Sequence, residues 1–205
     1  MKLNINVDAS TVPSNPGHIG IAFHASAGGR EVISWAYAGY GTSNYGEIMA
    51  IGFAIEVLKP GRRDSVKIHT DSMYAKQVLR GNWQPGPNRD LVSAVSGMLA
   101  PWIDNIELIP GHAGLVGNEV ADFAARQAGL AGKARIHTPV YILPGMASAQ
   151  VLKCERVIMP RWFLLQRLDR ELAERILEFH IKIRRGLRRG LDAPVVDQAV
   201  ELLRR

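Results

Sequence analysis

The stretch Lys2-Leu3-Asn4-Ile5-Asn6-Val7-Asp8 decides the fold, because polar and apolar side chains alternate along it and it ends on a carboxylate. Alternation with a period of two is typical of a half-buried strand. The stretch Val66-Lys67-Ile68-His69-Thr70-Asp71 has the same pattern and also ends on an aspartate. Two strands that end on carboxylates predict an acidic group at one edge of a sheet, where open sheets bind ligands.

The rest of residues 1–129 alternates between strand and helix signals. Further strands are predicted at about His18–Ala25, Glu31–Ala38 and Ile106–Ile109, with a tight turn at Gly28-Gly29. Helices are predicted at about Tyr45–Leu58, Ser72–Arg80, Arg89–Ala100 with Asn88 as its cap, and from Asn118 or Glu119 to Ala128. This order predicts an α/β fold, a mixed five-stranded sheet flanked by helices, with the later strands parallel to the first.

The chain is predicted to have three parts, which are a first domain at 1–130, a linker at 131–147 and a basic helical extension at 148–205. Within the extension, Arg161–Arg185 carries apolar residues at heptad-like steps, and a last helix is expected from Asp192 to Leu203. Together they predict a C-terminal helical hairpin. Its apolar stripe is buried against the first domain or against another chain, so a homodimer and a protein partner are both open.

The net charge of +6 is concentrated in this extension. Residues 1–129 hold 10 Lys and Arg against 11 Asp and Glu, whereas residues 130–205 hold 15 against 8. Such asymmetry favours an anionic partner for the tail. The candidate nucleic-acid contacts of the tail are Lys182, Arg184, Arg185, Arg188 and Arg189. The alternative is a solvated helix end.

The composition argues against several classes of protein. A single cysteine, Cys154, allows no internal disulfide and fits a reducing compartment. No apolar run approaches the roughly 20 residues of a membrane span, and the N-terminus lacks a signal-peptide pattern. We therefore expect a cytoplasmic protein that does not bind membranes.

Four carboxylates stand at separate places from which they can reach one point. Asp8 and Asp71 end strands, whereas Glu47 and Asp122 lie at the start of helical patterns. Hard divalent ions prefer oxygen ligands, and a pair of them stabilises both the attacking and the leaving oxygen of an in-line displacement. The set predicts a metal-dependent phosphodiester hydrolase. His112, in a glycine-containing loop, is a candidate for moving a proton or helping product leave.

These motifs, taken in order, resemble type 1 ribonuclease H across residues 1–129. The matching segments are Val7-Asp8-Ala9-Ser10, Asn15-Pro16-Gly17, Glu47, His69-Thr70-Asp71-Ser72, Gly111-His112-Ala113-Gly114 and Asn118-Glu119-Val120-Ala121-Asp122. The resemblance implies a ribonuclease H-like fold and an endoribonuclease that hydrolyses the RNA strand of RNA–DNA hybrids. It further implies two Mg²⁺ or Mn²⁺ ions per site with substrate, and products with a 5′-phosphate and a 3′-hydroxyl.

The resemblance also implies a role for each matching residue. The implied metal ligands are Asp8, Glu47, Asp71 and Asp122. His112 is implied to assist turnover, and Glu119 to assist metal exchange. The implied substrate contacts are Asn15 and Thr42 at the phosphates of the DNA strand, and Asn44 and Asn88 near the 2′-hydroxyls of the RNA. Reading a 2′-hydroxyl is how a protein separates RNA from DNA.

The sequence departs from the family pattern at three places. Ala9 follows Asp8 where many members have glycine, and Gly46 precedes Glu47 where a larger residue is commoner. The loop from Gly81 to Asn88 contains Trp83 but no Lys or Arg, where several relatives insert a basic protrusion. We therefore expect weak hybrid binding by the first domain alone, with the basic tail compensating, and we expect Trp83 to pack its loop.

Two other functions stay open at this level. One is a nucleic-acid-binding or scaffold protein that keeps the fold but has little turnover. The other is a nuclease that also cleaves double-stranded RNA, because the minor grooves of the two duplexes are similar. The complete set of acidic positions argues against the first.

Overall fold

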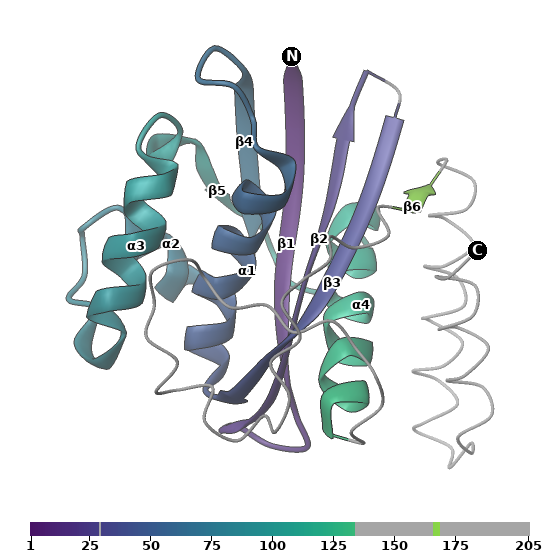
Figure 1. Ribbon diagram of the computed structural model, residues 1–205, viewed down its shortest axis with the longest axis vertical. Helices are drawn as coiled ribbons and strands as arrows, with labels where there is room; N and C mark the ends of the chain where they lie inside the picture. Colours follow the sequence, from purple (N-terminus) through teal and green to yellow (C-terminus); the bar gives the residue numbers. More distant parts are fainter. Residues whose placement is uncertain (29, 134–165, 169–205) are drawn as a thin grey trace.

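The computed structural model describes residues 1–28, 30–133 and 166–168, and it shows a sheet with helices on both faces (Figure 1). The strands are β1 (Lys2–Val12), β2 (Gly17–Ala27), β3 (Arg30–Gly41), β4 (Ser65–Thr70), β5 (Ile106–Leu108) and β6 (Gln166–Leu168). The helices are α1 (Ser43–Leu58), α2 (Met73–Leu79), α3 (Arg89–Leu99) and α4 (Val116–Lys133). Two short 3₁₀ turns, η1 (Gly86–Asn88) and η2 (Ile103–Asn105), precede α3 and β5.

The strands lie in the order β5-β4-β1-β2-β3-β6. β1, β2 and β3 form an antiparallel meander, whereas β4 lies parallel to β1 and β5 parallel to β4. The predicted mixed five-stranded sheet, with its later strands parallel to the first, is therefore confirmed for β1 to β5. β6 adds a sixth strand, antiparallel to β3, at the edge of the sheet.

The two faces of the sheet are covered by different helices. Leu3, Ile5 and Val7 of β1 are buried in a hydrophobic core with apolar residues of α1, α2 and α3. The alternate residues of β1 and β2 face α4, as the contact of Gly117 with Asn6 and that of Gly20 with Ala125 show. Since successive strand residues point to opposite faces, α1 and α4 lie on opposite sides of the sheet.

β1 extends beyond its parallel neighbour, and this places the functional site. β4 pairs with β1 only from Lys2↔Ser65 to Asn6↔His69 and ends at Thr70. β1 continues through Asp8 to Val12, paired on its other side with β2. The edge of β1 at Asp8 is therefore open on the β4 side, and groups from both faces can meet there.

Several element boundaries differ from the sequence predictions. β1 runs four residues past Asp8, and α4 starts two residues earlier than predicted and continues to Lys133, into the predicted linker. Asn88 precedes α3, but its side chain does not cap the helix; its Nδ2 donates a hydrogen bond to Tyr74 Oη at 3.0 Å. Trp83 is 49% exposed, so about half of it is covered, and the expectation that it packs its loop stays a prediction.

The tail predictions fall mostly outside the described residues. Within the helix predicted at 161–185, residues 166–168 form β6, so the prediction is wrong at these residues. The remainder of that helix, the last helix, the rest of the linker and the basic cluster from Lys182 to Arg189 lie outside the described residues. None of the described helices combines the length and apolar character that crossing a membrane requires.

Candidate active site

Asp8, Glu47 and Asp71 come together at the open edge of β1. One carboxylate oxygen from each lies within 4.8 Å of the others. Asp8 belongs to β1, Glu47 reaches the edge from the second turn of α1, and Asp71 directly follows β4. A strand, a helix on one face of the sheet and the end of a second strand therefore supply one cluster, which we call the inner cluster.

The inner cluster concentrates negative charge in a buried place. Asp8 and Glu47 are only 5% and 8% exposed. Burial raises the pKa of the Asp8 carboxyl well above its ordinary value, and the nearby carboxylates of Glu47, Asp122 and Asp71 raise it further. Burial likewise raises the pKa of Glu47, with Asp71 and then Asp122 adding to the effect. Each ionised group makes ionisation of its neighbours less favourable.

The backbone of Ala9 partly offsets this repulsion. Its N–H donates to Asp8 Oδ1 at 2.7 Å, and a hydrogen bond from the same backbone group lowers the pKa of Glu47. Glu47 Oε2 is buried and has no hydrogen-bond partner among the described residues. An acceptor left open beside like charges fits a cation.

Close backbone packing holds Asp71. Thr70 Oγ1 accepts a hydrogen bond from the N–H of Ser72 at 3.1 Å, and Ser72 Oγ in turn caps α2 by accepting from the N–H of Ala75. On the other side, a Cβ on Gly111 would stand 2.6 Å from Asp71 Oδ2. The absence of a side chain at Gly111 therefore lets the following loop approach the carboxylate.

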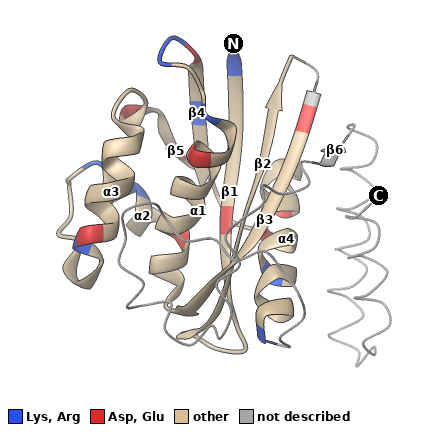
Figure 2. Ribbon diagram, in the orientation of Figure 1, with Lys and Arg blue, Asp and Glu red and all other residues tan. Residues whose placement is uncertain are grey.

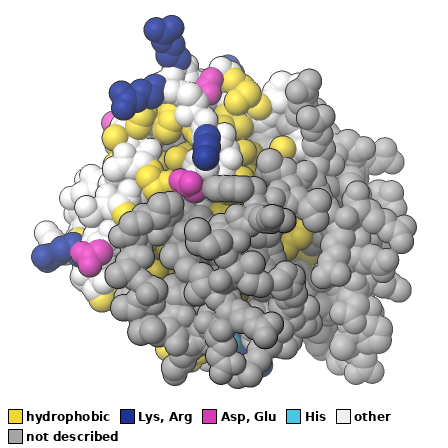
Figure 3. All heavy atoms as spheres, viewed as in Figure 1, with side chains coloured by type: hydrophobic (Ala, Val, Ile, Leu, Met, Phe, Trp, Pro, Cys, Tyr) yellow, Lys and Arg dark blue, Asp and Glu magenta, His cyan; other side chains and the backbone are white. Residues whose placement is uncertain are grey.

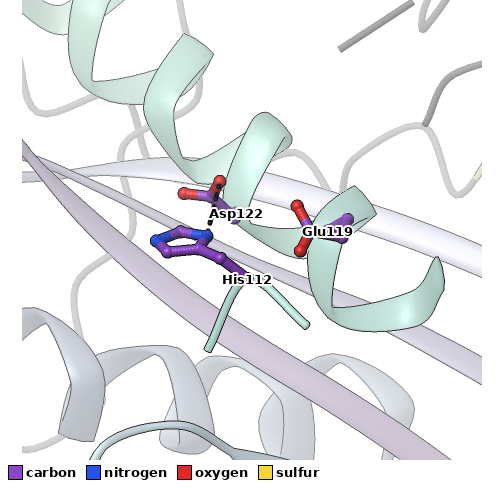
Figure 4. A group of neighbouring side chains, drawn as sticks. All are labelled: His112, Glu119 and Asp122. Atoms are coloured by element: carbon purple, nitrogen blue, oxygen red, sulfur yellow. Dashed lines mark ion pairs between the residues drawn. The ribbon is translucent and has the colours of Figure 1, made fainter. Parts of the chain in front are cut away.

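A second cluster, the outer cluster, consists of His112, Glu119 and Asp122, whose ligand atoms also lie within 4.8 Å of one another. Figure 4 shows His112 reaching from the loop before α4 toward Asp122, with Nδ1 at 3.9 Å from Oδ2. Glu119 lies one turn earlier on α4, and its Oε1 accepts a hydrogen bond from the N–H of Gly114 at 3.3 Å. The Asp122 carboxylate raises the pKa of both Asp8 and Glu47, so it connects the two clusters.

The donor set fits divalent metal ions. Across the two clusters it consists of carboxylate oxygens from five residues, with one imidazole at the margin. Oxygen donors are those that Mg²⁺ and Mn²⁺ prefer, and a cation would relieve the mutual repulsion that raises the pKa of Asp8 and Glu47. Figure 2 shows acidic positions on β1, α1 and α4, three of the elements that converge here.

Three of the four predicted substrate contacts gather at the start of α1. Thr42 caps this helix, accepting from the N–H of Tyr45 at 3.3 Å, and Asn44 is exposed in its first turn. Asn15, exposed in the loop between β1 and β2, donates to Ser43 Oγ at 2.8 Å and accepts from the N–H of Ser43 at 3.0 Å. Asn88 lies apart from them, next to Tyr74, and is 9% exposed.

Sequence reasoning missed the groups that have no side-chain chemistry. The N–H of Ala9 and the bare backbone of Gly111 both touch carboxylates of the inner cluster. Ala9 follows Asp8, and Gly111 precedes His112 in its loop. A glycine beside a predicted ligand is a weak signal of close approach, and only the packing shows which atom it approaches.

In a comparison with known protein families, residues 1–129 match the RNase H family model. A ribonuclease H of Methylobacillus flagellatus is 33% identical over 126 residues, which cover 55% of this chain and 82% of that protein. The family match covers the part of the chain that carries the four carboxylates.

Solved structures show the same fold. An N-terminal RNase H domain from Mycobacterium tuberculosis matches with a TM-score of 0.55 and 20% identity, covering 66% of this chain and 99% of the domain. LC11-RNase H1 in complex with an RNA/DNA hybrid matches with a TM-score of 0.50 and 22% identity, covering 62% of this chain and 98% of that one. At these identities the likeness concerns the fold.

Proposed function

The chain belongs to the ribonuclease H family and is a ribonuclease H enzyme, and from this premise we propose that it hydrolyses the RNA strand of RNA–DNA hybrids. The observation that carries the proposal is the convergence of Asp8, Glu47 and Asp71 within 4.8 Å, beside Asp122, inside the segment that matches the family. The hybrid bound in the LC11-RNase H1 structure, which has the same fold, supports the choice of substrate.

We propose that Asp8, Glu47, Asp71 and Asp122 hold two divalent ions, Mg²⁺ or Mn²⁺, when substrate is bound. Such a pair stabilises charge on both the attacking and the leaving oxygen, and the products would carry a 5′-phosphate and a 3′-hydroxyl. The buried position of Asp8 and Glu47 keeps water from screening these charges, so electrostatic stabilisation is strong there.

His112 and Glu119 are proposed to serve turnover rather than ion binding at the inner cluster. The His112 side chain is 55% exposed and stands next to Asp122, so it can exchange a proton with solvent while remaining close to the reacting phosphate. Glu119 holds the loop through Gly114 and keeps a carboxylate beside His112 and Asp122. Asn15, Thr42 and Asn44 would contact the hybrid at the start of α1, and Asn88 would contact it from the turn before α3.

The test is cleavage of an RNA–DNA hybrid, labelled at the RNA 5′ end, in Mg²⁺ or Mn²⁺, with Asp71→Asn as the matched control. Metal-dependent cleavage of the RNA strand that disappears in the variant is expected. Absence of cleavage by the full chain with either metal, together with retained hybrid binding, would instead support the binding-module alternative. Double-stranded RNA of the same sequence, run in parallel, distinguishes hybrid specificity from a broader nuclease.

The basic tail is proposed to add affinity for the hybrid. Among the described residues, the loop from Gly81 to Asn88 carries no Lys or Arg. On the face that Figure 3 shows, the Lys and Arg side chains of the described residues stand apart from one another. Phosphate contacts dominate non-specific nucleic-acid affinity and make it depend on salt. Ending the chain after Lys133, where α4 ends, should therefore weaken hybrid binding and flatten its salt dependence.

An unchanged affinity and salt slope in the shortened chain would remove the tail from substrate binding. Sedimentation of both forms tests the other prediction for the tail, because a homodimer that depends on it would become a monomer on truncation. The expected cytoplasmic location and a protein partner for the tail stay predictions.

A further inference from the structure

Helix α1 approaches β1 unusually closely at the level of the inner cluster. A Cβ placed on Gly46 would stand 2.9 Å from the Cβ of Ala9 and 2.8 Å from Cγ2 of Ile19. Carbon atoms in contact normally lie about 3.5–4.0 Å apart. The methyl group of Ala9 therefore occupies space that a side chain at position 46 would need.

Both partners of this contact are next to a carboxylate of the site. Ala9 follows Asp8 in β1, and Gly46 precedes Glu47 in α1. The backbone N–H of Ala9 donates to Asp8 Oδ1 at 2.7 Å, and the same backbone group lies close enough to the Glu47 carboxylate to lower its pKa. The distance between β1 and α1 at this point thus determines whether one peptide group can serve both carboxylates.

Glycine costs about 1 kcal/mol in a helix interior, so Gly46 taken by itself is unfavourable near the start of α1. The structure gives it a steric purpose. Gly46 is buried, and the first turn of α1 is capped by Thr42, so the helix start is formed despite the glycine. Positions 9 and 46 are also two of the places at which the chain departs from the usual family pattern.

We infer that Ala9 and Gly46 form a complementary positioning pair, in which one methyl group, present at 9 and absent at 46, sets the spacing of Asp8 and Glu47. Protein interiors are close-packed and leave no empty space for an extra methyl group, so adding one displaces the neighbouring backbone. An added methyl at 46 pushes α1 away from β1 and carries Glu47 with it. Removal of the methyl at 9 lets α1 move inward.

The inference rests on the proposed function for its activity readout, and it is tested by a swap of the methyl group. Gly46→Ala is expected to lower kcat on the hybrid about 100-fold, as misplacement of a catalytic group by about 1 Å does. KM should change less. The variant should need a higher Mn²⁺ concentration than the wild type to raise its midpoint of thermal unfolding. Ions stabilise the protein by binding the folded site, and a displaced Glu47 weakens that binding.

The double variant Ala9→Gly/Gly46→Ala restores one methyl between the two positions. It is expected to regain about tenfold or more of the kcat lost in Gly46→Ala, together with Mn²⁺ affinity, while the contact with Ile19 keeps rescue incomplete. Gly97→Ala is the matched control, since it makes the same change inside α3, where an added Cβ meets nothing within 4 Å. It should keep wild-type kcat and Mn²⁺ affinity.

A double variant no better than Gly46→Ala would overturn the inference, as would a Gly46→Ala that behaves like Gly97→Ala. If Gly46→Ala does not fold, recovery of folded protein in the double variant supports the pair, and failure to recover it counts against the pair. Ala9→Gly alone should fold and lose kcat; wild-type kcat and Mn²⁺ affinity in that variant would also overturn it. If the wild-type chain does not cleave hybrid, the proposed function fails, and the Mn²⁺ shifts still test the pair.

Discussion

Asp122 belongs to the outer cluster and also raises the pKa of Asp8 and Glu47 in the inner cluster. The fold nevertheless holds the two clusters in different ways. The inner cluster lies at the open edge of β1, where Asp8 and Glu47 are buried and the backbone of Gly111 presses against Asp71. In the outer cluster, His112 comes from a loop, and its side chain is 55% exposed. One cluster is fixed by close packing on three elements, and the other is open to solvent.

We propose that the two clusters have different roles. Charge stabilisation in a transition state requires groups whose positions are set beforehand, which favours strands, helix turns and buried backbone. Proton exchange and product release require access and motion, which favours a loop. His112 also has φ at 56°, a conformation that costs a non-glycine residue about 1–2 kcal/mol and that recurs at functional sites.

The largest effect is expected from Asp8→Asn, which removes a charge from the inner cluster without changing its shape. We expect kcat on the hybrid to fall by about 10²–10³-fold or more, because the site loses a fixed charge at its buried centre. Steady-state cleavage in saturating Mn²⁺, with hybrid affinity measured separately, checks this. Retention of more than a tenth of wild-type kcat would remove Asp8 from the inner cluster's function.

A smaller but still large effect is expected from Gly111→Ala, which leaves every charge in place. The added Cβ would stand 2.6 Å from Asp71 Oδ2, so the loop or the carboxylate must move. We expect kcat to fall about 100-fold, as for other small misplacements of a catalytic group. Gly97→Ala again serves as the control, and equal activity in the two variants would show that Asp71 tolerates displacement.

His112→Ala tests the outer cluster and should have a milder effect. We expect multiple-turnover cleavage to fall about tenfold while the rate of a single turnover changes less, because a loop group that serves release does not set the chemical step. Rapid-mixing measurements with enzyme in excess and with substrate in excess separate the two rates. An equal loss in both would move His112 into the chemical step itself.

The smallest expected effect is a pH-dependent change in thermal stability, which we expect for a variant of the inner cluster. The pKa of Asp8 is raised in the folded protein, so its contribution to stability is fully present in acid and is lost as the pH rises through the folded value. Metal-free Asp8→Asn should therefore unfold at a higher temperature than wild type near neutral pH. The difference should shrink as the pH falls toward 3.8, the ordinary pKa of an aspartate.

Thermal unfolding in a chelator across this pH range, followed by repetition in Mn²⁺, provides the check. Mn²⁺ should remove or reverse the advantage of Asp8→Asn, since the ion binds the wild-type carboxylates. His112→Ala serves as the comparison from the outer cluster. A wild type more stable than Asp8→Asn in chelator at neutral pH would contradict the charge repulsion described for the inner cluster.

Much of the fold could be predicted from local patterns. The alternation in Lys2–Asp8 and Val66–Asp71 and the helical spacing after Tyr45 identified β1, β4 and α1. They placed Asp8 and Glu47 on β1 and α1 and Asp71 at the end of β4. Boundaries were less accurate, since β1 and α4 both continue past their predicted ends. Heptad-like spacing did not predict β6, because pairing with the open edge of β3 is a long-range interaction that leaves no local period.

The chain by itself determined which residues alternate, which loops are short and where the four carboxylates stand along it. These properties depend on neighbours within a few residues, through the periods of 2 and 3.6 that strands and helices impose. Only the tertiary structure decided that Glu47 meets Asp8 across the open edge of β1. It also decided that Gly46 accommodates Ala9 and that Gly111 approaches Asp71. These are contacts between distant segments, where packing rather than local periodicity chooses the partner.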